Sequence, residues 1–556
     1  MHGPSETSPR LGRIVPLLLL LPSLLWILTD HRVWPWDQSW FGEVSADLWS
    51  TAVRDSLAAW SRLMLHAIAS KPPAVVWIGQ AFAPLSAVLG WEPALLLSIL
   101  ATQAASLVLF WVSVARLFGP GTPAGWPPGW PPGWIAATAG VLTLAASPLF
   151  IGMTNQYFAE PVQLLSVCLF LWIAVNRYAM GRLRLIAWLV LAAALGLAAK
   201  TTTPLYAFGF GLVALSGLVR RPAAEPVESR IVTAVLLAAA LGMAALTVGW
   251  YVVNAEHTLR HALQSATGSV ALHYGTVGDF STKLAFWLRS LKAALLLPGA
   301  GPVAAVAVPA LLVLAAWRIR SGRSAPAATP AIASSGPAMG PVVLAAVLQI
   351  VAVLTAFSLN INEESRFLLP LFPSVALLVA LAVAAAGRTA GAAVAGLLAL
   401  QWAVAHAMAL GWIPVHADNP WLQAREVDGT RLATIERLAA ATCPSSDAGR
   451  INLVGTEQPW LNAYTMSFLS ARGRAQVGWR CYYTSLGYAQ TDIDSAWERL
   501  QAMNINQIVM LDADLEAPGN FLNQINVPIR RRLEADQGIL SKPFSDGITL
   551  FLRRQP

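Results

Sequence analysis

Three acidic side chains lie close together in the polar connection after the first apolar block of the chain. Asp37, Glu43 and Asp47 occur in the run 36–49, among several aromatic residues. If this run is helical, the i,i+4 spacing places Glu43 and Asp47 on one face. The aromatic residues favour a helix on a membrane surface, where a partly apolar setting can raise the pKa of a carboxyl toward that of a general base. The alternative is an interfacial helix whose acids are incidental.

Four more ionisable side chains lie within or beside apolar stretches. Lys71 precedes two prolines, which suit the first turn of a helix because the N–H group that proline lacks has no helical partner there. A lysine held at the start of such a helix can bind a phosphate group. Glu160, Lys200 and Arg366 stand at the edges of other apolar blocks. Ionisable groups at membrane depth are costly and are therefore functional candidates, although Lys and Arg near an interface reach water cheaply.

The apolar stretches are too long and too many for a soluble protein. Of the 556 residues, 56% are hydrophobic and only 12% are charged, whereas soluble domains carry about 25% charged residues. Blocks of roughly 18 or more apolar residues are typical of membrane-spanning helices. We therefore predict a mainly α, polytopic membrane helix bundle with about 11 to 13 spans. The blocks cover 14–29, 73–90, 93–117, 134–152, 158–176, 184–199, 203–219, 231–253, 291–317, 341–358, 367–386 and 389–412.

The net charge does not indicate binding to nucleic acid, and the cysteines do not indicate a zinc site. The net charge is +8, but the basic residues gather at the ends of the apolar blocks, as the positive-inside rule expects. Cys168, Cys443 and Cys481 form no Cys-x-x-Cys pair, so a zinc finger or a thiol redox site is not expected. We expect membrane lipids around the chain and no nucleic-acid partner.

The distribution of Lys and Arg predicts the orientation. Basic hinges at 176–184, 220–221 and 318–323 are predicted to be cytoplasmic together with the N-terminus. The remaining connections and everything after about 413 then face outward, into the periplasm if this is the inner (plasma) membrane of a bacterium. One conflict arises, because this orientation needs an odd number of crossings between 71 and 118, where two apolar blocks occur. Six charged candidates share the extracytoplasmic side: Asp37, Glu43, Lys71, Glu160, Lys200 and Arg366.

The composition changes near the end of the last apolar block. We predict a membrane domain over 1–413 and a small extracytoplasmic α/β domain over 414–556. Within the second domain, Cys443 and Cys481 are compatible either with a disulfide in an oxidising compartment or with two free buried thiols. Strands are predicted at 451–455, 508–511 and 548–552, and helices at 462–470 and 494–503.

The order of these motifs resembles a known family. An acid after the first helix, Lys71-Pro72-Pro73, Glu160, Lys200-Thr201 and Arg366-Phe367-Leu368-Leu369-Pro370 follow one another over residues 14–412. This order is similar to that of the protein O-mannosyltransferases and the lipid A aminoarabinose transferases, membrane glycosyltransferases of the GT-C fold. The resemblance implies a donor sugar carried on a polyprenyl monophosphate, and an acceptor hydroxyl that attacks the anomeric carbon.

The resemblance also implies roles for the candidates. Asp37 matches the acid that acts as general base or orients the acceptor. Lys71 and Arg366 match positions that face the leaving phosphate. Lys200 and Glu160 match a pair that shapes the sugar or phosphate pocket. A second acid of the first loop, which would order that loop, corresponds here to Glu43.

Several positions depart from the family pattern. Gln38 stands where the mannosyltransferases have Glu, and Phe367 stands where Tyr is usual. Ser70 replaces a Glu that helps to hold a metal in the aminoarabinose transferases, so no motif here supports the divalent metal that the family allows. The remaining candidates for a metal ligand are histidines of the 254–290 loop, which are more often ordinary surface residues: His257, His261 and His273.

The function expected from these features is membrane glycosyl transfer from a polyprenyl-phosphate sugar to an acceptor hydroxyl. The acceptor class stays open between glycan, lipid and protein. One alternative is a transporter or flippase of a lipid-linked sugar, which would place polar groups at mid-membrane on broken helices. Another is a polysaccharide polymerase or ligase with a diphosphate donor and an outer loop rich in Arg and His, a description that the 254–290 loop partly fits.

Overall fold

The structure is a computed structural model that divides into two compact units. It describes residues 14–118, 133–219, 229–300, 339–415, 419–444, 450–487, 490–503, 505–512, 515 and 523–553. The helical unit comprises residues 1–28, 69–75 and 96–424, and the sheet unit comprises 29–68, 76–95 and 425–556. The first outer connection therefore groups with the C-terminal part of the chain, whereas the predicted division at 413 kept the two apart.

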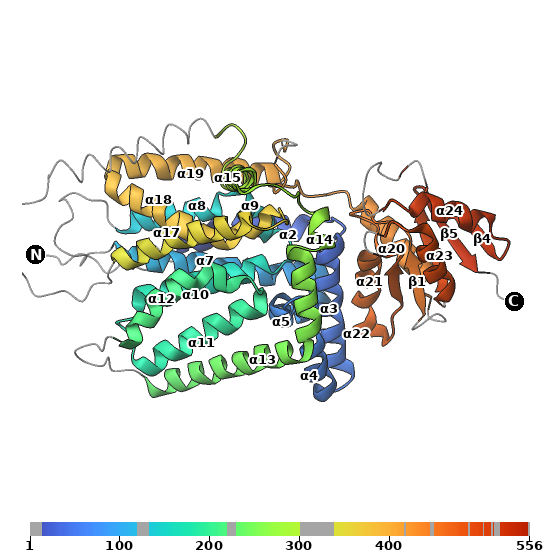
Figure 1. Cartoon of the computed structure of the whole chain (residues 1–556), viewed down its shortest axis with the longest axis horizontal. Coiled ribbons are helices and arrows are strands. Elements are labelled where there is room, and N and C mark those ends of the chain that lie inside the picture. The colour runs from blue at the N-terminus through green and yellow to red at the C-terminus, as the bar shows by residue number, and fades with distance from the viewer. Residues whose placement is uncertain are drawn as a thin grey trace, which may run out of the picture. The chain divides into compact units, whose positions relative to one another are not determined.

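The helical unit is built from long apolar helices, of which α10, α11, α12 and α13 lie side by side (Figure 1). Several of its helices, among them α9, α10 and α18, begin with a proline in their first turn, where the missing N–H costs nothing. The helices are α2 (Leu21–Thr29), α7 (Trp91–Leu117, whose first turn belongs to the sheet unit), α8 (Gly133–Ala145), α9 (Pro148–Thr154), α10 (Glu160–Asn176), α11 (Arg182–Ala199), α12 (Thr203–Val219), α13 (Arg230–Ala266), α14 (Ser269–His273), α15 (Phe280–Leu295), α17 (Met339–Ser358), the 3₁₀ helix η2 (Ser365–Leu371), α18 (Phe372–Ala386) and α19 (Arg388–Ala409).

The described helices confirm a polytopic membrane bundle. Six of them are long and apolar enough to cross a membrane, or seven if α8 and α9, bent by 66° at their junction, form one broken span. Three shorter apolar helices, Ile14–Thr29, Glu160–Asn176 and Thr203–Val219, add to these. The described residues therefore provide fewer full-length spans than the predicted 11 to 13. The block predicted at 291–317 extends into residues outside the described ranges.

The apolar block predicted at 73–90 does not form a spanning helix. The chain there makes three short helices, α5 (Ala74–Gly79), η1 (Ala83–Leu85) and α6 (Ser86–Leu89). Pro84 lies within η1, and Gly90 ends α6 with a φ of 86°, a conformation that favours glycine. One long helix, α7, is then the sole candidate span between 71 and 118, all of which is described. This removes the conflict over the number of crossings.

Small residues let the helices of this core approach closely. A Cβ atom on Gly140 of α8 would lie 2.8 Å from the Phe110 ring of α7. Gln349 of α17 is fully buried, accepts from the Phe210 N–H of α12 at 2.9 Å and donates to Ser374 Oγ of α18 at 3.2 Å.

In Figure 1 α15 is seen end-on, whereas α17, α18 and α19 run across the view, so α15 crosses their direction steeply.

The sheet unit contains a five-stranded mixed sheet in the order β2-β1-β3-β5-β4. The strands are β1 (Ile451–Val454), β2 (Tyr482–Ser485), β3 (Ile505–Leu511), β4 (Ile539–Pro543) and β5 (Ile548–Arg553). β1 is parallel to β2 and β3, and β5 is antiparallel to β3 and β4. The three predicted strands are confirmed as β1, β3 and β5. The two edge strands were not predicted, because β2 lacks an apolar run and β4 is largely exposed.

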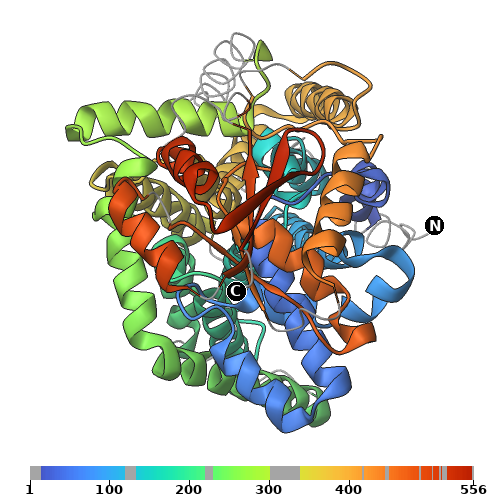
Figure 2. The same cartoon turned by 90° about the vertical axis from the view of Figure 1, so that its right-hand side faces the viewer.

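Helices cover both faces of this sheet. The unit contains α3 (Trp36–Arg54), α4 (Leu57–His66), α20 (Thr430–Thr442), α21 (Ala463–Arg472), α22 (Arg474–Val477), α23 (Ile493–Ala502) and α24 (Asn526–Ala535). Residues of α20 and α21 share one apolar cluster with alternate strand residues such as Val454 and Val509. Residues of α23 and α24 share the other cluster with the intervening residues Leu453 and Ile508. Figure 2 shows the sheet with helices on either side.

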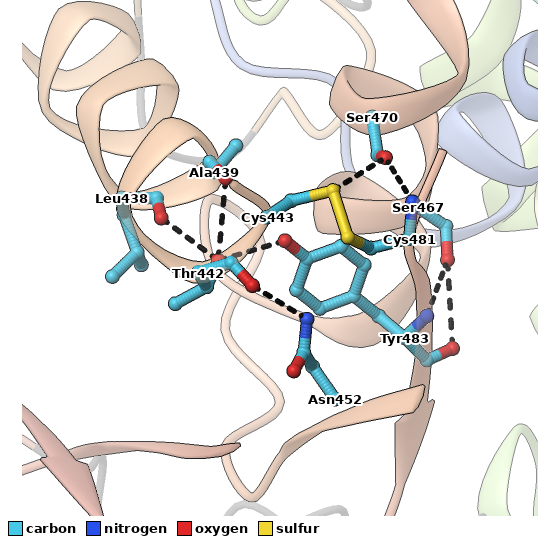
Figure 3. The surroundings of a disulfide bond; sticks show 9 residues. All are labelled: Leu438, Ala439, Thr442, Cys443, Asn452, Ser467, Ser470, Cys481 and Tyr483. Atoms are coloured by element: carbon cyan, nitrogen blue, oxygen red, sulfur yellow. Dashed lines mark hydrogen bonds between the residues drawn. A yellow bond between two sulfur atoms is a disulfide. The ribbon is translucent and has the colours of Figure 1, made fainter. Parts of the chain in front are cut away.

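A disulfide joins Cys443, just after α20, to Cys481, just before β2 (Figure 3). Its neighbours form hydrogen bonds around it: Ser470 Oγ accepts from the Cys481 N–H at 3.0 Å, and the hydroxyls of Thr442 and Tyr483 lie 2.7 Å apart. Cys481 is fully buried. Of the two alternatives for these cysteines, the structure has the disulfide.

Candidate active site

Three of the predicted charged residues meet at the ends of helices in the helical unit. Glu160 is the first residue of α10, where the helix dipole favours a carboxylate. Lys200 follows the last residue of α11, and Arg366 lies in η2. The Lys200 Nζ donates to Glu160 Oε1 at 2.8 Å, and the Arg366 Nε lies 3.4 Å from the same oxygen. One buried carboxylate therefore lies between two cations.

Aromatic rings and a second acid complete the surroundings of these cations. The Lys200 ammonium lies 3.5 Å from the centroid of the Phe367 ring, and the Arg366 guanidinium lies 4.6 Å from that of Phe158. Both contacts are cation–π interactions, in which the ring face attracts the cation. Glu364 pairs with Arg366 at 3.0 Å. The Lys200 and Arg366 side chains keep 21% and 17% of their surface exposed, so the protein does not fully enclose either of them.

The segment that carries Arg366 is tied to a second loop. Lys283 of α15, which is only 2% exposed, donates to the Ile361 carbonyl at 2.8 Å and pairs with Glu363 at 3.1 Å. Glu363 also accepts from the Thr276 N–H at 3.1 Å. Gly275 lies so close to the Ile361 carbonyl that any side chain there would collide with it. The sequence offered no signal for Lys283 or Glu363, because neither stands in a motif.

Lys71 belongs to the same unit and is half-buried. Its segment is held at both ends, since Thr258 of α13 donates to the Ala69 carbonyl at 3.1 Å and Tyr157 donates to the Val75 carbonyl at 2.9 Å. Tyr157 directly precedes Phe158, which contacts Arg366. The Lys71 segment is therefore attached to the turn that leads into Glu160.

Asp37 lies in the first turn of α3 in the sheet unit and is half-buried. Trp36 before it has a φ of 24°, which a bulky residue adopts only where its surroundings hold it. The Trp36 indole donates to Glu457 Oε2 at 3.0 Å. Burial, together with the charge of Asp37, raises the pKa of Tyr464 to about 12.

Glu43 and Asp47 share one partner in the sheet unit. Arg480 lies 2.7 Å from Glu43 Oε1 through Nη1 and 2.8 Å from Asp47 Oδ2 through Nη2. Asp47 also accepts from Arg474 at 3.2 Å. Burial raises the pKa of Glu43 to about 7, against the lowering effect of Arg480. The role predicted for Glu43 in substrate binding stays a prediction, and its observed contacts are ion pairs.

The histidines of the outer loop lie on two helices. His257 and His261 lie on α13, and His273 ends α14. Among the residues that the structure describes, no three His, Cys, Asp or Glu side chains form a group that could hold a metal ion. Together with Ser70 in place of an acid, these residues do not fit the metal site that the family resemblance allows.

Comparison with solved structures identifies the fold over nearly the whole chain. No protein-family model matches the sequence, and no curated protein matches it significantly. The fold is similar to that of ArnT from Cupriavidus metallidurans bound to undecaprenyl phosphate, with a TM-score of 0.56 and 12% identity over 98% of each chain. The apo state of the same protein gives a TM-score of 0.55, 13% identity and the same coverage. The chain has the GT-C fold.

The GT-C fold accounts for the distance in sequence between the interacting residues. Glu160, Lys200 and Arg366 stand at the ends of three different helices, which packing brings together. The predicted orientation put all three on one side of the membrane, and the family resemblance implied a pair of Glu160 and Lys200. Glu364, which pairs with Arg366, was missed, because an acid two residues before an arginine in a loop is common in any protein.

We expect Glu160→Gln to reduce the stability of the fold, since the amide leaves the two cations without their shared negative charge. Breaking a fully buried ion pair costs about 3–5 kcal/mol. Because Lys200 and Arg366 are partly exposed, the expected loss is lower, about 2 kcal/mol. Thermal unfolding of the purified protein in detergent, followed by tryptophan fluorescence, measures it.

The matched control is Glu364→Gln. Glu364 pairs with Arg366 and is 25% exposed, so its loss should cost about 1 kcal/mol or less. Equal destabilisation by the two variants would contradict the central place of Glu160.

Proposed function

We propose that the protein is a membrane glycosyltransferase that moves a sugar from a polyprenyl-phosphate donor to an acceptor hydroxyl on the extracytoplasmic face. The observation that carries this proposal is the pair of accessible cations around Glu160 in a chain that matches ArnT over 98% of both lengths. The ArnT structure contains undecaprenyl phosphate, a lipid monophosphate of the kind that the proposed reaction releases.

The donor phosphate is proposed to lie against Lys71 and Arg366. When the bond between the anomeric carbon and the phosphate oxygen breaks, the electron pair stays on that oxygen and adds negative charge to the lipid phosphate. Fixed cations stabilise this charge in the transition state more than in the ground state. The planar guanidinium of Arg366 can donate two parallel hydrogen bonds to the phosphate, and its contacts with Glu160 and Phe158 hold it in position.

Asp37 is proposed to act on the acceptor. As the acceptor oxygen forms its bond to the anomeric carbon, the hydroxyl proton passes to the Asp37 carboxylate. Glu160 and Lys200 are proposed to line the sugar pocket, because a neutralised ion pair offers hydrogen-bond donors and acceptors to sugar hydroxyls without a net charge. These assignments use the position of each residue and the chemistry of its side chain.

The extracytoplasmic side is supported by the C-terminal part of the chain. A disulfide such as Cys443–Cys481 persists in oxidising compartments. The predicted orientation places this domain outward, and an inner membrane with a periplasmic active site fits the disulfide and this prediction. The acceptor is a glycan, a lipid or a protein hydroxyl.

A flippase would use the same lipid phosphate in a different place. Transporters bind their substrates near the middle of the membrane on broken helices. Here Glu160 begins α10 and Lys200 follows the end of α11, so the charged groups lie at helix ends. With the predicted orientation, which puts these helix ends on the extracytoplasmic side, this placement favours an enzyme that works at a membrane surface.

We expect Lys71→Ala to weaken donor binding more than acceptor binding. A charge-assisted hydrogen bond to phosphate contributes about 1.5–3 kcal/mol, so the Kd for undecaprenyl phosphate should rise about 10- to 100-fold. Binding to the purified protein in detergent micelles, titrated by intrinsic fluorescence, measures this change.

Lys292→Ala serves as the control, because Lys292 is an exposed lysine of α15 in the same unit. Its affinity for the lipid phosphate should match that of the wild type. An unchanged Kd in Lys71→Ala would remove Lys71 from the phosphate site.

A further inference from the structure

One guanidinium in the sheet unit binds two carboxylates that lie one turn apart on α3. Arg480 contacts Glu43 at 2.7 Å and Asp47 at 2.8 Å through its two terminal nitrogens. The i,i+4 spacing puts both acids on one face of α3. A planar fork that binds two groups one turn apart restricts rotation of the helix about its axis as well as sliding along it.

Arg480 is itself held firmly. Its side chain is 7% exposed, and its guanidinium lies 4.3 Å from the centroid of the Tyr482 ring. The next residue, Cys481, is joined to Cys443 by the disulfide, and Tyr482 begins β2. The guanidinium is thus attached to the edge of the sheet rather than to a mobile loop.

Direct packing on α21 also joins α3 to the C-terminal part of the sheet unit. A Cβ atom on Gly42 would lie 2.9 Å from the Phe468 ring, so the two helices approach closely there. The Phe468 ring also stacks on Trp34 with centroids 5.3 Å apart, and Thr465 donates to the Trp34 carbonyl at 2.9 Å. α3 therefore packs as a helix of the C-terminal domain, although about 400 residues of sequence separate them.

Asp37 lies six residues before Glu43 on the same helix, a rise of about 9 Å. Because a helix of this length is rigid, a small rotation at Glu43 displaces Asp37 with it. We propose that Arg480 is a positioning residue that sets the rotation of α3 and thereby the place of the Asp37 carboxylate, with Glu43 and Asp47 as its anchors. The inference rests on the proposed function of Asp37 and extends it to the C-terminal domain.

The test is Arg480→Gln in the full chain. A displacement of about 1 Å at a reacting group can cost on the order of 10²-fold in rate, so we expect kcat to fall about 10- to 100-fold. The KM for the polyprenyl-phosphate donor should change less than about twofold, because the cations assigned to the phosphate belong to the other unit. Arg480→Lys keeps the charge without the fork and should recover only part of kcat.

Arg530→Gln is the matched control. Arg530 also contacts two carboxylates, Asp512 at 2.7 Å and Glu534 at 2.9 Å, and both belong to the C-terminal part of the sheet unit. We expect its kcat to match the wild type. A fall in kcat as large as that of Arg480→Gln would assign the effect to general loss of stability and overturn the inference.

A triple variant separates position from stability. Glu43→Gln, Asp47→Asn and Arg480→Gln together remove the acids along with the cation, so neither acid nor cation is left buried without its partner. Arg474, which loses Asp47, is 26% exposed and keeps Asp55 at 3.6 Å. We expect thermal stability to return toward that of the wild type while kcat stays low. Recovery of both, or an unchanged kcat in Arg480→Gln, would overturn the inference.

Amide hydrogen exchange over residues 36–54 tests the inference without activity. Exchange should be faster in Arg480→Gln than in the wild type, and unchanged in Arg530→Gln. If the wild type transferred no sugar from any polyprenyl phosphate, the proposed function would fail. Faster exchange confined to Arg480→Gln would still support the inference that Arg480 fixes α3. Equal exchange in all three proteins would show that Arg480 does not fix α3.

Discussion

Asp37→Asn should abolish sugar transfer while leaving the protein folded. Asparagine has the size of aspartate but cannot accept the proton of an acceptor hydroxyl. General base catalysis contributes about 10²- to 10⁴-fold, and we expect kcat to fall by that factor. Transfer of a radiolabelled sugar from a polyprenyl-phosphate donor measures the fall, and donor binding should stay within about twofold of the wild type.

Asp55→Asn is the control for this substitution. Asp55 ends the same helix as Asp37 and is 47% exposed, so its loss should leave kcat unchanged. Full activity of Asp37→Asn would exclude Asp37 from the chemical step and leave the acceptor without an identified base.

Arg366→Gln should produce the second large effect, on the departure of the lipid phosphate. Removing one donor that stabilises developing negative charge costs about 10²- to 10³-fold in kcat. We expect kcat/KM for the donor to fall by at least this factor, measured in the same transfer assay. Arg366→Lys should recover part of the loss, because it restores the charge without the planar fork.

Stability must be separated from chemistry in this variant, because Arg366 also contacts Glu160 and Glu364. Glu160→Gln disturbs the same cluster and retains the guanidinium, so its kcat should fall less than that of Arg366→Gln. Arg289→Gln, on the exposed side of α15, should behave as the wild type. If Glu160→Gln and Arg366→Gln lost activity equally, the assignment of Arg366 to the phosphate would be wrong.

The sequence predicts the charged cluster because a membrane restricts where charges can lie. An acid or a base next to an apolar helix is costly unless it pairs or reaches water, so Glu160, Lys200 and Arg366 stood out against their surroundings. Their direct contact follows in the structure. The roles of all six predicted residues, with Asp37, Glu43 and Lys71 among them, stay predictions.

Other features could not be read from the sequence. The block at 73–90 is apolar enough for a span, but it forms short helices, of which η1 has Pro84 in its first turn and α6 ends at Gly90. The partners of Glu43 and Asp47 lie more than 420 residues away, and local patterns carry no information on such pairing. The sequence was compatible with a disulfide or with two free thiols at Cys443 and Cys481, and the structure has the disulfide.

The most direct test of the account uses purified full-length protein and its Asp37→Asn variant with a panel of radiolabelled polyprenyl-phosphate sugars. We predict that the wild type cleaves one of these donors, releasing polyprenyl phosphate and transferring the sugar to an acceptor or to water, while the variant leaves every donor intact. Intact donors with the wild type, together with movement of labelled lipid across vesicles containing it, would contradict the account and identify a transporter.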